Sequence, residues 1–158
     1  KYPSSEEFEK ANIQIIYMGW FWKDWSLINN GIHSISNGLE IRDRSVKDTG
    51  DITRVTALDE DWVTLNQMIK YYKYGFGRVS DSINEEIRAE RITRDQGIKI
   101  LEEYDGSCAS EYIESFCSYI DIEVDLFWET VKKSVNRDLF NIEKDGSIKP
   151  LFKVGKGI

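Results

Sequence analysis

Histidine and cysteine are scarce in this chain. Its 158 residues include one histidine, His33, and two cysteines, Cys108 and Cys117. A zinc site takes about four such ligands, so we expect this chain to hold no metal by itself. The cysteines are not spaced as C-x-x-C, and two cysteines do not make a disulfide framework. We predict free, packed thiols, as is usual in a cytoplasmic protein.

Long apolar runs and a positive charge balance are also lacking. The most apolar stretch, residues 13–25, is interrupted by polar residues and is shorter than the roughly 18 residues that span a bilayer. No signal peptide is visible. A net charge of −7 argues against a partner that is bound through its phosphates, such as nucleic acid, and against anionic membrane. We therefore expect a cytoplasmic protein with no nucleic-acid and no membrane partner.

The common short catalytic motifs are missing as well. There is no G-x-x-x-x-G-K-[ST] loop, no G-x-S-x-G elbow and no H-E-x-x-H. His33 could serve as a general base, but a lone histidine near a helix end is more often a bystander. The residues alone identify no reaction.

Apolar residues at helical spacing dominate the second part of the chain. The composition, 41% hydrophobic and 13% aromatic, is sufficient for the core of one domain. Five apolar stripes between Asp59 and Asn136 are separated by glycines or capping boxes, such as Thr93 with Gln96. We predict a mainly α protein with at least four helices in this range and a helical domain over 59–158.

The first 58 residues have a different pattern. Ser4 and Glu7 form a capping box that predicts a short helix over 5–11. The β-branched run 13–17 predicts a short buried strand. A short helix is predicted over 24–30, ended by Gly31. The polar stretch 37–59 is predicted to be a long loop, with a possible short hairpin.

Two glycines between positive charges form the most informative local feature. Gly75 and Gly77 permit close approach of the backbone to a ligand, and Lys73 and Arg78 flank them. Arg78 would lie at a helix N-terminus, where free N–H groups suit anions. One interpretation is a phosphate cradle. The other, which the residues alone favour, is an ordinary turn between helices with Phe76 in the core.

Three arginines and three tryptophans are each open to two interpretations. Arg88, Arg91 and Arg94 could bind phosphate or carboxylate, or could pair on the surface with the interleaved acids Glu85, Glu86 and Glu90. The tryptophans, clustered within residues 20–25, could stack on a sugar or a base. A place in the core or in a subunit interface is the interpretation that we favour. These are Trp20, Trp22 and Trp25.

The block from Lys73 to Asp105 resembles a known family. It reads KYGFGRVSDSINEEIRAERITRDQGIKILEEYD and is similar to the pattern K-[FY]-G-F-G-R-x-[ST]-D-x-x-x-x-[DE]-I-R-x-x-R-[IL]-T-R of the N-acetyl sugar amidotransferases. These belong to the PP-loop ATP pyrophosphatase group and serve lipopolysaccharide synthesis. The resemblance extends to residues 17–22, 120–129 and 152–155. Glu90 stands where the family often has glycine, and Gly97 where alanine is usual.

The resemblance implies a fold and an activity. The chain would be the helical C-terminal part of an α/β PP-loop (adenine nucleotide alpha hydrolase-like) enzyme, with residues 1–58 as the tail end of the nucleotide-binding half plus a long loop. The complete enzyme would use ATP and Mg²⁺ to convert the acetamido group of a nucleotide-linked sugar to an acetamidino group. A glutaminase subunit would supply ammonia. We expect Lys73, Gly75, Gly77, Arg78, Arg88 and Arg91 to contribute to the ATP site.

The resemblance also limits what this chain does alone. The family's S-G-G-x-D-S loop and C-x-x-C pairs are not in this sequence, so we expect the isolated chain to bind no cofactor and to be inactive. We also expect the chain to form homo-oligomers. An alternative function is a non-catalytic helical assembly or interaction module of this or another PP-loop enzyme, whose helices and tryptophans form a subunit interface. A PP-loop enzyme acting on tRNA is disfavoured by the acidic balance.

Overall fold

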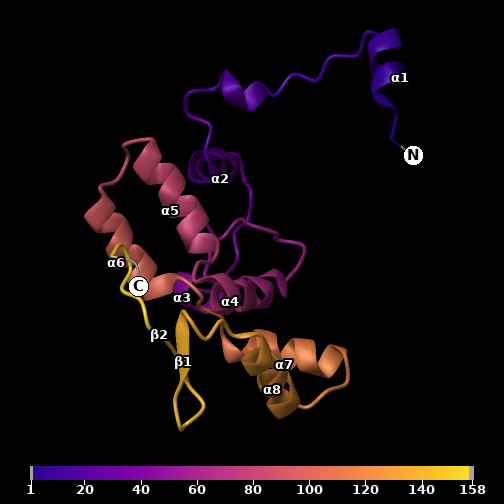
Figure 1. The fold of residues 1–158 in the computed structure, drawn as a ribbon. Helices are drawn as coiled ribbons and strands as arrows, with labels where there is room; N and C mark the ends of the chain where they lie inside the picture. Colours follow the sequence, from indigo (N-terminus) through magenta and orange to yellow (C-terminus); the bar gives the residue numbers. More distant parts are fainter. Residues whose placement is uncertain (1, 157–158) are drawn as a thin grey trace.

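The protein is mainly α-helical, as predicted. The computed structural model describes residues 2–156 except the side chain of Trp20. Within them, eight α-helices, one 3₁₀ turn and one two-stranded antiparallel sheet follow one another along the chain (Figure 1). Their bounds are α1 Ser5–Lys10, η1 Met18–Trp20, α2 Leu27–Ser36, α3 Val46–Thr49, α4 Val63–Tyr74, α5 Arg78–Arg88, α6 Arg94–Tyr104, α7 Ser110–Tyr119, α8 Val124–Ser134, β1 Phe140–Ile142 and β2 Ile148–Pro150. No helix among the described residues is long and apolar enough to cross a membrane.

Side-chain caps explain where several helices begin. The predicted capping boxes of Ser4 with Glu7 and of Thr93 with Gln96 are both present, and they open α1 and α6. Ser45 forms a further capping box that opens α3. Each cap satisfies backbone N–H groups that have no partner inside the helix. The sequence therefore sets these helix starts locally, before any tertiary contact.

The core lies where α4, α7 and α8 meet. Its buried members are the apolar stripes that the sequence predicts on these helices, and the five predicted helices between residues 59 and 136 are confirmed. Both thiols are free, as predicted, and Cys117 is buried in this core. The buried cluster consists of Leu65, Met68, Ile113, Cys117, Phe127 and Val131.

A small β-hairpin, which the sequence analysis missed, follows α8. In its antiparallel register Phe140 lies opposite Pro150 and Ile142 opposite Ile148. Phe140 is 1% exposed and packs edge-on against Tyr71 and Tyr72 of α4 and against Phe152. The hairpin thereby attaches the C-terminal segment to α4.

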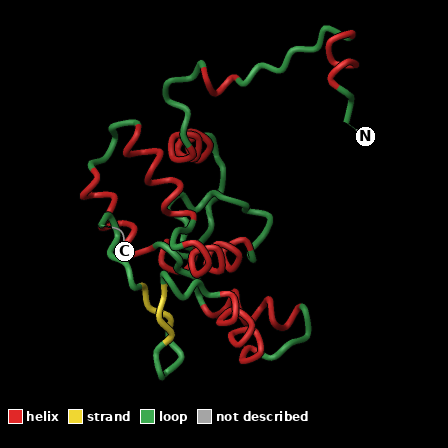
Figure 2. The backbone as a smooth tube through the Cα atoms, in the orientation of Figure 1, coloured by secondary structure: helices red, strands yellow, loops and turns green. Residues whose placement is uncertain are grey.

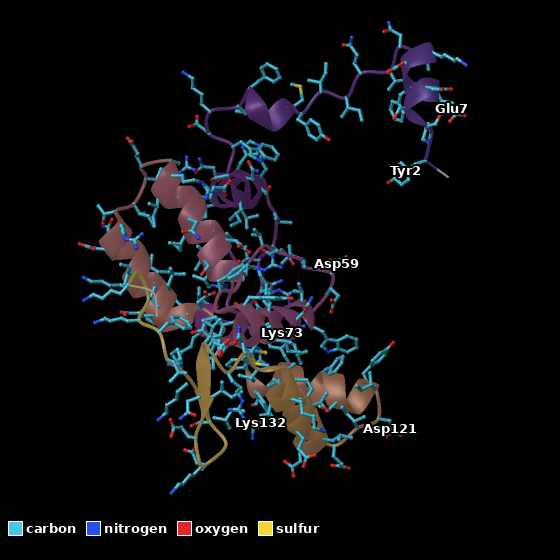
Figure 3. All side chains as sticks on the ribbon, viewed as in Figure 1. Tyr2, Glu7, Asp59, Lys73, Asp121 and Lys132 are labelled. Atoms are coloured by element: carbon cyan, nitrogen blue, oxygen red, sulfur yellow. The ribbon has the colours of Figure 1, made fainter. Side chains whose placement is uncertain are left out.

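The predicted strand at residues 13–17 is wrong. This stretch is extended but pairs with no other described segment, and its apolar side chains are exposed. A lone strand is not stable without neighbours to complete its hydrogen bonds. The stretch belongs to an arm, residues 2–25, that leads away from the helical body (Figure 2). Figure 3 shows Tyr2 and Glu7 at the far end of this arm.

The helix predicted over 24–30 is displaced. Ser26 caps α2 by accepting a hydrogen bond from the backbone of Asn29, and the helix continues through Gly31 to Ser36. Gly31 is buried inside the helix, where the side chain of Val55 packs so close that an added Cβ would lie 3.1 Å from it. This glycine serves packing and does not end the helix.

The polar stretch 37–59 forms a loop with the short helix α3 and without the predicted hairpin. One backbone hydrogen bond, from Arg42 N to Arg54 O (3.0 Å), closes it on itself. The backbone N–H of Ala109 donates to the carbonyl of Asp48 at 2.8 Å, which ties the loop to the start of α7. The division of the chain at residue 58 stays a prediction.

Candidate functional site

The loop between α4 and α5, residues 75–77, is called the glycine loop here. It packs against the side-chain carboxylate of Asp105. Gly75 ends α4 with φ 79°, a left-handed conformation that favours glycine. Gly77 is extended, so its backbone does not demand glycine. An added Cβ there would lie 2.6 Å from Asp105 Oδ1. The sequence predicts close approach at these glycines, and the approaching group is the Asp105 side chain at the end of α6.

Asp105 occupies the N-terminus of α5. Its Oδ2 accepts hydrogen bonds from the Gly77 N–H at 3.0 Å and from the Ser80 hydroxyl at 2.5 Å. Its Oδ1 is buried and has no partner among the described residues. A negative charge is favourable at a helix N-terminus. Nothing local in the sequence indicates that Asp105 contacts Gly77, which lies 28 residues away.

A pocket of about 260 Å³ lies beside this carboxylate. Burial, followed by the charge of Asp105, raises the pKa of Tyr71 in its wall to about 12, so the phenol stays protonated as a hydrogen-bond donor. The pocket joins the glycine loop to the C-terminal segment, two parts of the sequence that both carry the family resemblance. Its lining residues are Tyr71, Tyr74, Gly75, Ser80, Leu101, Asp105, Leu139, Phe152, Lys153, Val154 and Gly155.

The two cations that flank the glycines stand at the surface. Lys73 is exposed, with its ammonium 5.7 Å from the centre of the Tyr74 ring. Arg78 is half-buried and is the first residue of α5, as predicted. Within residues 2–156, neither takes part in an ion pair. Phe76 is 43% exposed and lies under the ammonium of Lys70, at 4.6 Å, so its prediction as a core residue is wrong.

The three predicted arginines are engaged differently. Arg91 makes a two-pronged pair with Glu86, at 2.7 and 3.0 Å. This pairing lowers the pKa of Glu86. Arg94 donates to the carbonyl of Gly155 at 2.9 Å and holds the C-terminal segment against α6, whereas Arg88 is exposed at the end of α5. Pairing with an interleaved acid, one of the two interpretations, therefore describes Arg91, but the Glu86 carboxylate is buried and does not lie on the surface as predicted.

Comparison with protein families identifies the family to which this chain belongs. A family model described as LPS biosynthesis protein WbpG-like, C-terminal domain, matches residues 49–154. The chain belongs to this family. The match spans α4 to α8, the hairpin and the pocket beside Asp105. The predicted C-terminal part of a lipopolysaccharide-biosynthesis protein is thereby confirmed. Searches of curated proteins and of solved structures gave no match.

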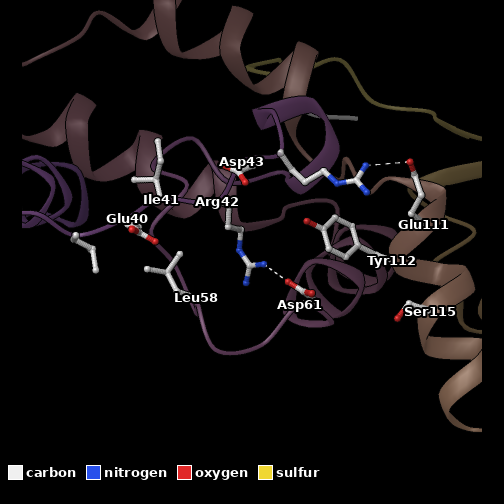
Figure 4. A pocket seen from close by; sticks show the side chains of 11 residues that line it. Glu40, Ile41, Arg42, Asp43, Leu58, Asp61, Glu111, Tyr112 and Ser115 are labelled. Carbon is white, nitrogen blue, oxygen red and sulfur yellow. Dashed lines mark hydrogen bonds and ion pairs between the residues drawn. The ribbon is translucent and has the colours of Figure 1, made fainter.

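A second cleft, of about 700 Å³, lies between the polar loop and α7 and is lined in part by charged groups (Figure 4). The Arg42 guanidinium pairs with Asp61 and donates to the carbonyls of Ala57 and Glu60. Arg44 pairs with Glu111 of α7 at 3.0 Å. These arginines already have partners that fold the polar loop onto α7. We therefore assign the cleft a structural role. The sequence analysis did not single out these arginines.

The two thiols, the clustered tryptophans and the histidine complete the survey of predicted residues. Burial raises the pKa of Cys108 to about 12 and also raises that of Cys117, so neither thiol is activated as a nucleophile. Trp22 and Trp25 are exposed, which overturns their placement in the core. Trp20's side chain lies outside the described atoms. His33 is exposed on α2.

Proposed function

We propose that this chain is the C-terminal part of an ATP-dependent N-acetyl sugar amidotransferase of lipopolysaccharide synthesis. In the complete enzyme, the acetamido oxygen of a nucleotide-linked sugar attacks the α-phosphorus of ATP and releases pyrophosphate. Ammonia then adds to the activated carbon, and AMP leaves with its oxygen to give the amidine. The supporting observation is that the glycine loop and the C-terminal segment, which both carry the family resemblance, line one pocket.

Lys73 and Arg78 have the clearest role in this proposal. Both are cations outside any described ion pair, and they flank the loop whose glycines bring the backbone close to its neighbours. Negative charge that develops on pyrophosphate is stabilised by such donors. Asp105 already accepts from Gly77 N–H, so an incoming phosphate would meet the side chains of Lys73 and Arg78 and not this backbone donor. Arg91 ranks lower because Glu86 holds it.

This proposal requires cofactors and a partner subunit that act in the complete enzyme. Magnesium would arrive with ATP, bound to its phosphates and to one or two carboxylates of the complete enzyme. A glutaminase subunit would supply ammonia. The reaction would take place in the cytoplasm, where nucleotide-linked sugars and ATP are available.

The test is a steady-state assay of amidine formation by the complete enzyme with saturating ammonia, which bypasses the glutaminase. Lys73→Ala and Arg78→Ala should each lower turnover by about 10²- to 10³-fold, the usual loss when one donor to a developing negative charge is removed. Lys133→Ala and Arg137→Ala are matched controls, since both side chains are exposed elsewhere. Wild-type turnover and ATP affinity in Arg78→Ala would show that the loop only connects two helices.

An assembly module is the second candidate function. It is favoured by the arm, whose apolar side chains Ile15, Ile16, Met18 and Phe21 are exposed. Exposed apolar surface of several hundred Å² commonly marks an interaction site. In this case the isolated chain would form a stable homo-oligomer in light scattering and bind neither ATP nor pyrophosphate. A monomer that binds pyrophosphate would contradict it.

A further inference from the structure

A pocket of about 510 Å³ lies between the two exposed tryptophans and one face of α2. We call it the indole pocket. Trp22 and Trp25 are 63% and 55% exposed, with ring centroids 6.5 Å apart and planes tilted by 40°. Most of each indole surface is thus available to a ligand. The lining residues are Trp22, Asp24, Trp25, Asn29, Asn30, His33 and Ser34.

The opposite wall of the indole pocket is polar. Asn29, Asn30, His33 and Ser34 recur at the spacing that places residues on one helix face. Asn29 uses its side-chain N–H to hold the carbonyl of Asp24 at 3.0 Å. Among the described residues, the side chains of Asn30 and His33 make no hydrogen bond within the protein. They are therefore available to donate to a ligand and to accept from it.

The α2 wall of the indole pocket is anchored to the helical body directly after Trp25. Ser26, directly after Trp25, is fully buried and caps α2. The backbone N–H of Leu27 donates to Glu85 Oε2 of α5 at 3.0 Å. The α2 wall is therefore pre-organised, which lowers the entropy cost of binding on that side of the pocket.

The lining chemistry selects one class of ligand. A sugar ring offers an apolar C–H face that stacks on indoles, and hydroxyl or amide groups that pair with Asn, Asp, His and Ser. The lining contains one carboxylate and no Lys or Arg, so it does not suit the phosphates of a nucleotide.

We infer that the indole pocket binds the N-acetyl sugar ring of the substrate. Trp22 and Trp25 stack on the apolar face of the ring, and Asp24, Asn30 and His33 bind its polar groups. This inference rests on the proposed function, which supplies the sugar, and adds where that sugar is held. It separates recognition of the sugar at α2 from that of ATP at the glycine loop.

Binding is tested on the 158-residue chain by NMR titration with the methyl glycoside of N-acetylglucosamine. We expect Trp22, Trp25 and His33 resonances to shift, with affinity in the millimolar range usual for one small ring, about −4 kcal/mol. Trp25→Ala should weaken binding at least tenfold and leave thermal unfolding unchanged. Phe21→Ala is the matched control, because Phe21 is 77% exposed on the same arm and does not line the pocket.

Several outcomes would overturn the inference. Absence of shifts, or equal losses in Trp25→Ala and Phe21→Ala, would show that no sugar site exists here. Shifts of the same resonances with UDP alone, or with methyl glucoside at equal affinity, would remove the N-acetyl sugar as the ligand. A Trp25→Ala variant that changes only the oligomeric state would make this surface a subunit interface.

The complete enzyme distinguishes failure of this inference from failure of the proposed function. Trp25→Ala should raise the KM for the nucleotide sugar at least tenfold and leave the KM for ATP unchanged, whereas Lys73→Ala and Arg78→Ala should impair the use of ATP. If the Trp25→Ala enzyme forms amidine with an unaltered KM for the nucleotide sugar, the indole pocket is refuted and the proposed function is not. An enzyme that forms no amidine refutes the proposed function, while the titration still measures sugar binding.

Discussion

At the scale of single residues, the Asp105 carboxylate limits what can stand at position 77. Because Gly77 has an extended backbone, the cost of a side chain there is steric. A Cβ would lie 2.6 Å from Asp105 Oδ1. We expect Gly77→Ala to lower the free energy of unfolding by about 1–3 kcal/mol, typical of overpacking, as measured by urea denaturation.

Asp105→Ala provides the control for that prediction. In this background the clash is gone, so adding Gly77→Ala should cost much less than it does in the wild type. The coupling between the two changes measures the contact directly. Equal costs in both backgrounds would show that Asp105 does not restrict position 77.

The pair of Glu86 with Arg91 gives stability a dependence on pH. The hydrogen bond that Arg91 donates to Glu86 lowers the pKa of the Glu86 carboxyl below its ordinary value of 4.5. The folded state therefore binds a proton at Glu86 less readily than the unfolded state does. The stabilisation is present above pH 4.5 and is lost as pH falls through the lowered folded pKa. Glu86→Gln should cost about 1.5–3 kcal/mol near pH 7.

Denaturant unfolding from pH 7 down to pH 3 measures this difference. The gap between wild type and Glu86→Gln should close as the wild-type carboxylate becomes protonated. A gap that stays constant over this range would mean that the charge of Glu86 does not contribute to stability.

At positions 90 and 97, where this chain departs from the family pattern, the structure shows constraints that the sequence does not reveal. Glu90, where the family often has glycine, adopts φ 57°, a left-handed conformation that costs an L-residue about 1–2 kcal/mol. Gly97, where alanine is usual, lies so close to α5 that a Cβ would be 2.7 Å from the Ile87 side chain. Backbone angle and packing distance are not visible in a residue pattern.

At the scale of elements, helices were predictable and strands were not. Capping boxes and apolar stripes are local signals, and they located α4 to α8 closely. The run at 13–17 has β-branched residues but no neighbour to pair with, whereas Phe140–Ile142 and Ile148–Pro150 form strands of three residues each because they pair. Strand formation depends on a partner, which intrinsic preference does not reveal.

The hairpin also carries a prediction about stability. Phe140 is the residue that attaches β1 to α4, through its contacts with Tyr71 and Tyr72. Phe140→Ala should lower the free energy of unfolding by about 3–5 kcal/mol, as expected for a buried phenylalanine. Leu151, 56% exposed just after β2, is the control, and Leu151→Ala should cost less than about 0.5 kcal/mol. Similar losses in chemical denaturation would show that the hairpin does not pack as described.

At the scale of the whole molecule, the arm and the helical body contribute differently to stability. Helix α1 contains no buried residue, and residues 12–19 are exposed throughout. Deletion of residues 1–19 should therefore leave the thermal midpoint of unfolding unchanged, because no core contact is removed. Circular dichroism measures this. A fall of more than a few degrees would show that the arm packs on the body in solution.

The candidate site was only partly predictable for a similar reason. Lys73, Gly75, Gly77 and Arg78 are adjacent in sequence, so a local motif was enough to select them. Of these four, only Gly75 lines the pocket beside Asp105, and the segment 152–155 reaches that pocket from far along the chain. The positions of Asp105 and of this segment beside the pocket depend on how α6 and the hairpin pack, and no local sequence pattern encodes this packing.

The position of Ser26 has a consequence for proteolysis. Peptide bonds after Tyr17, Phe21 and Trp22 are exposed and lie in a segment without stable secondary structure, the kind of site that proteases cut first. From Ser26 onward the backbone is held by the cap of α2 and by Glu85. Chymotrypsin should therefore trim the chain towards residue 22 and then slow sharply, which would leave a resistant fragment that retains α2 to β2.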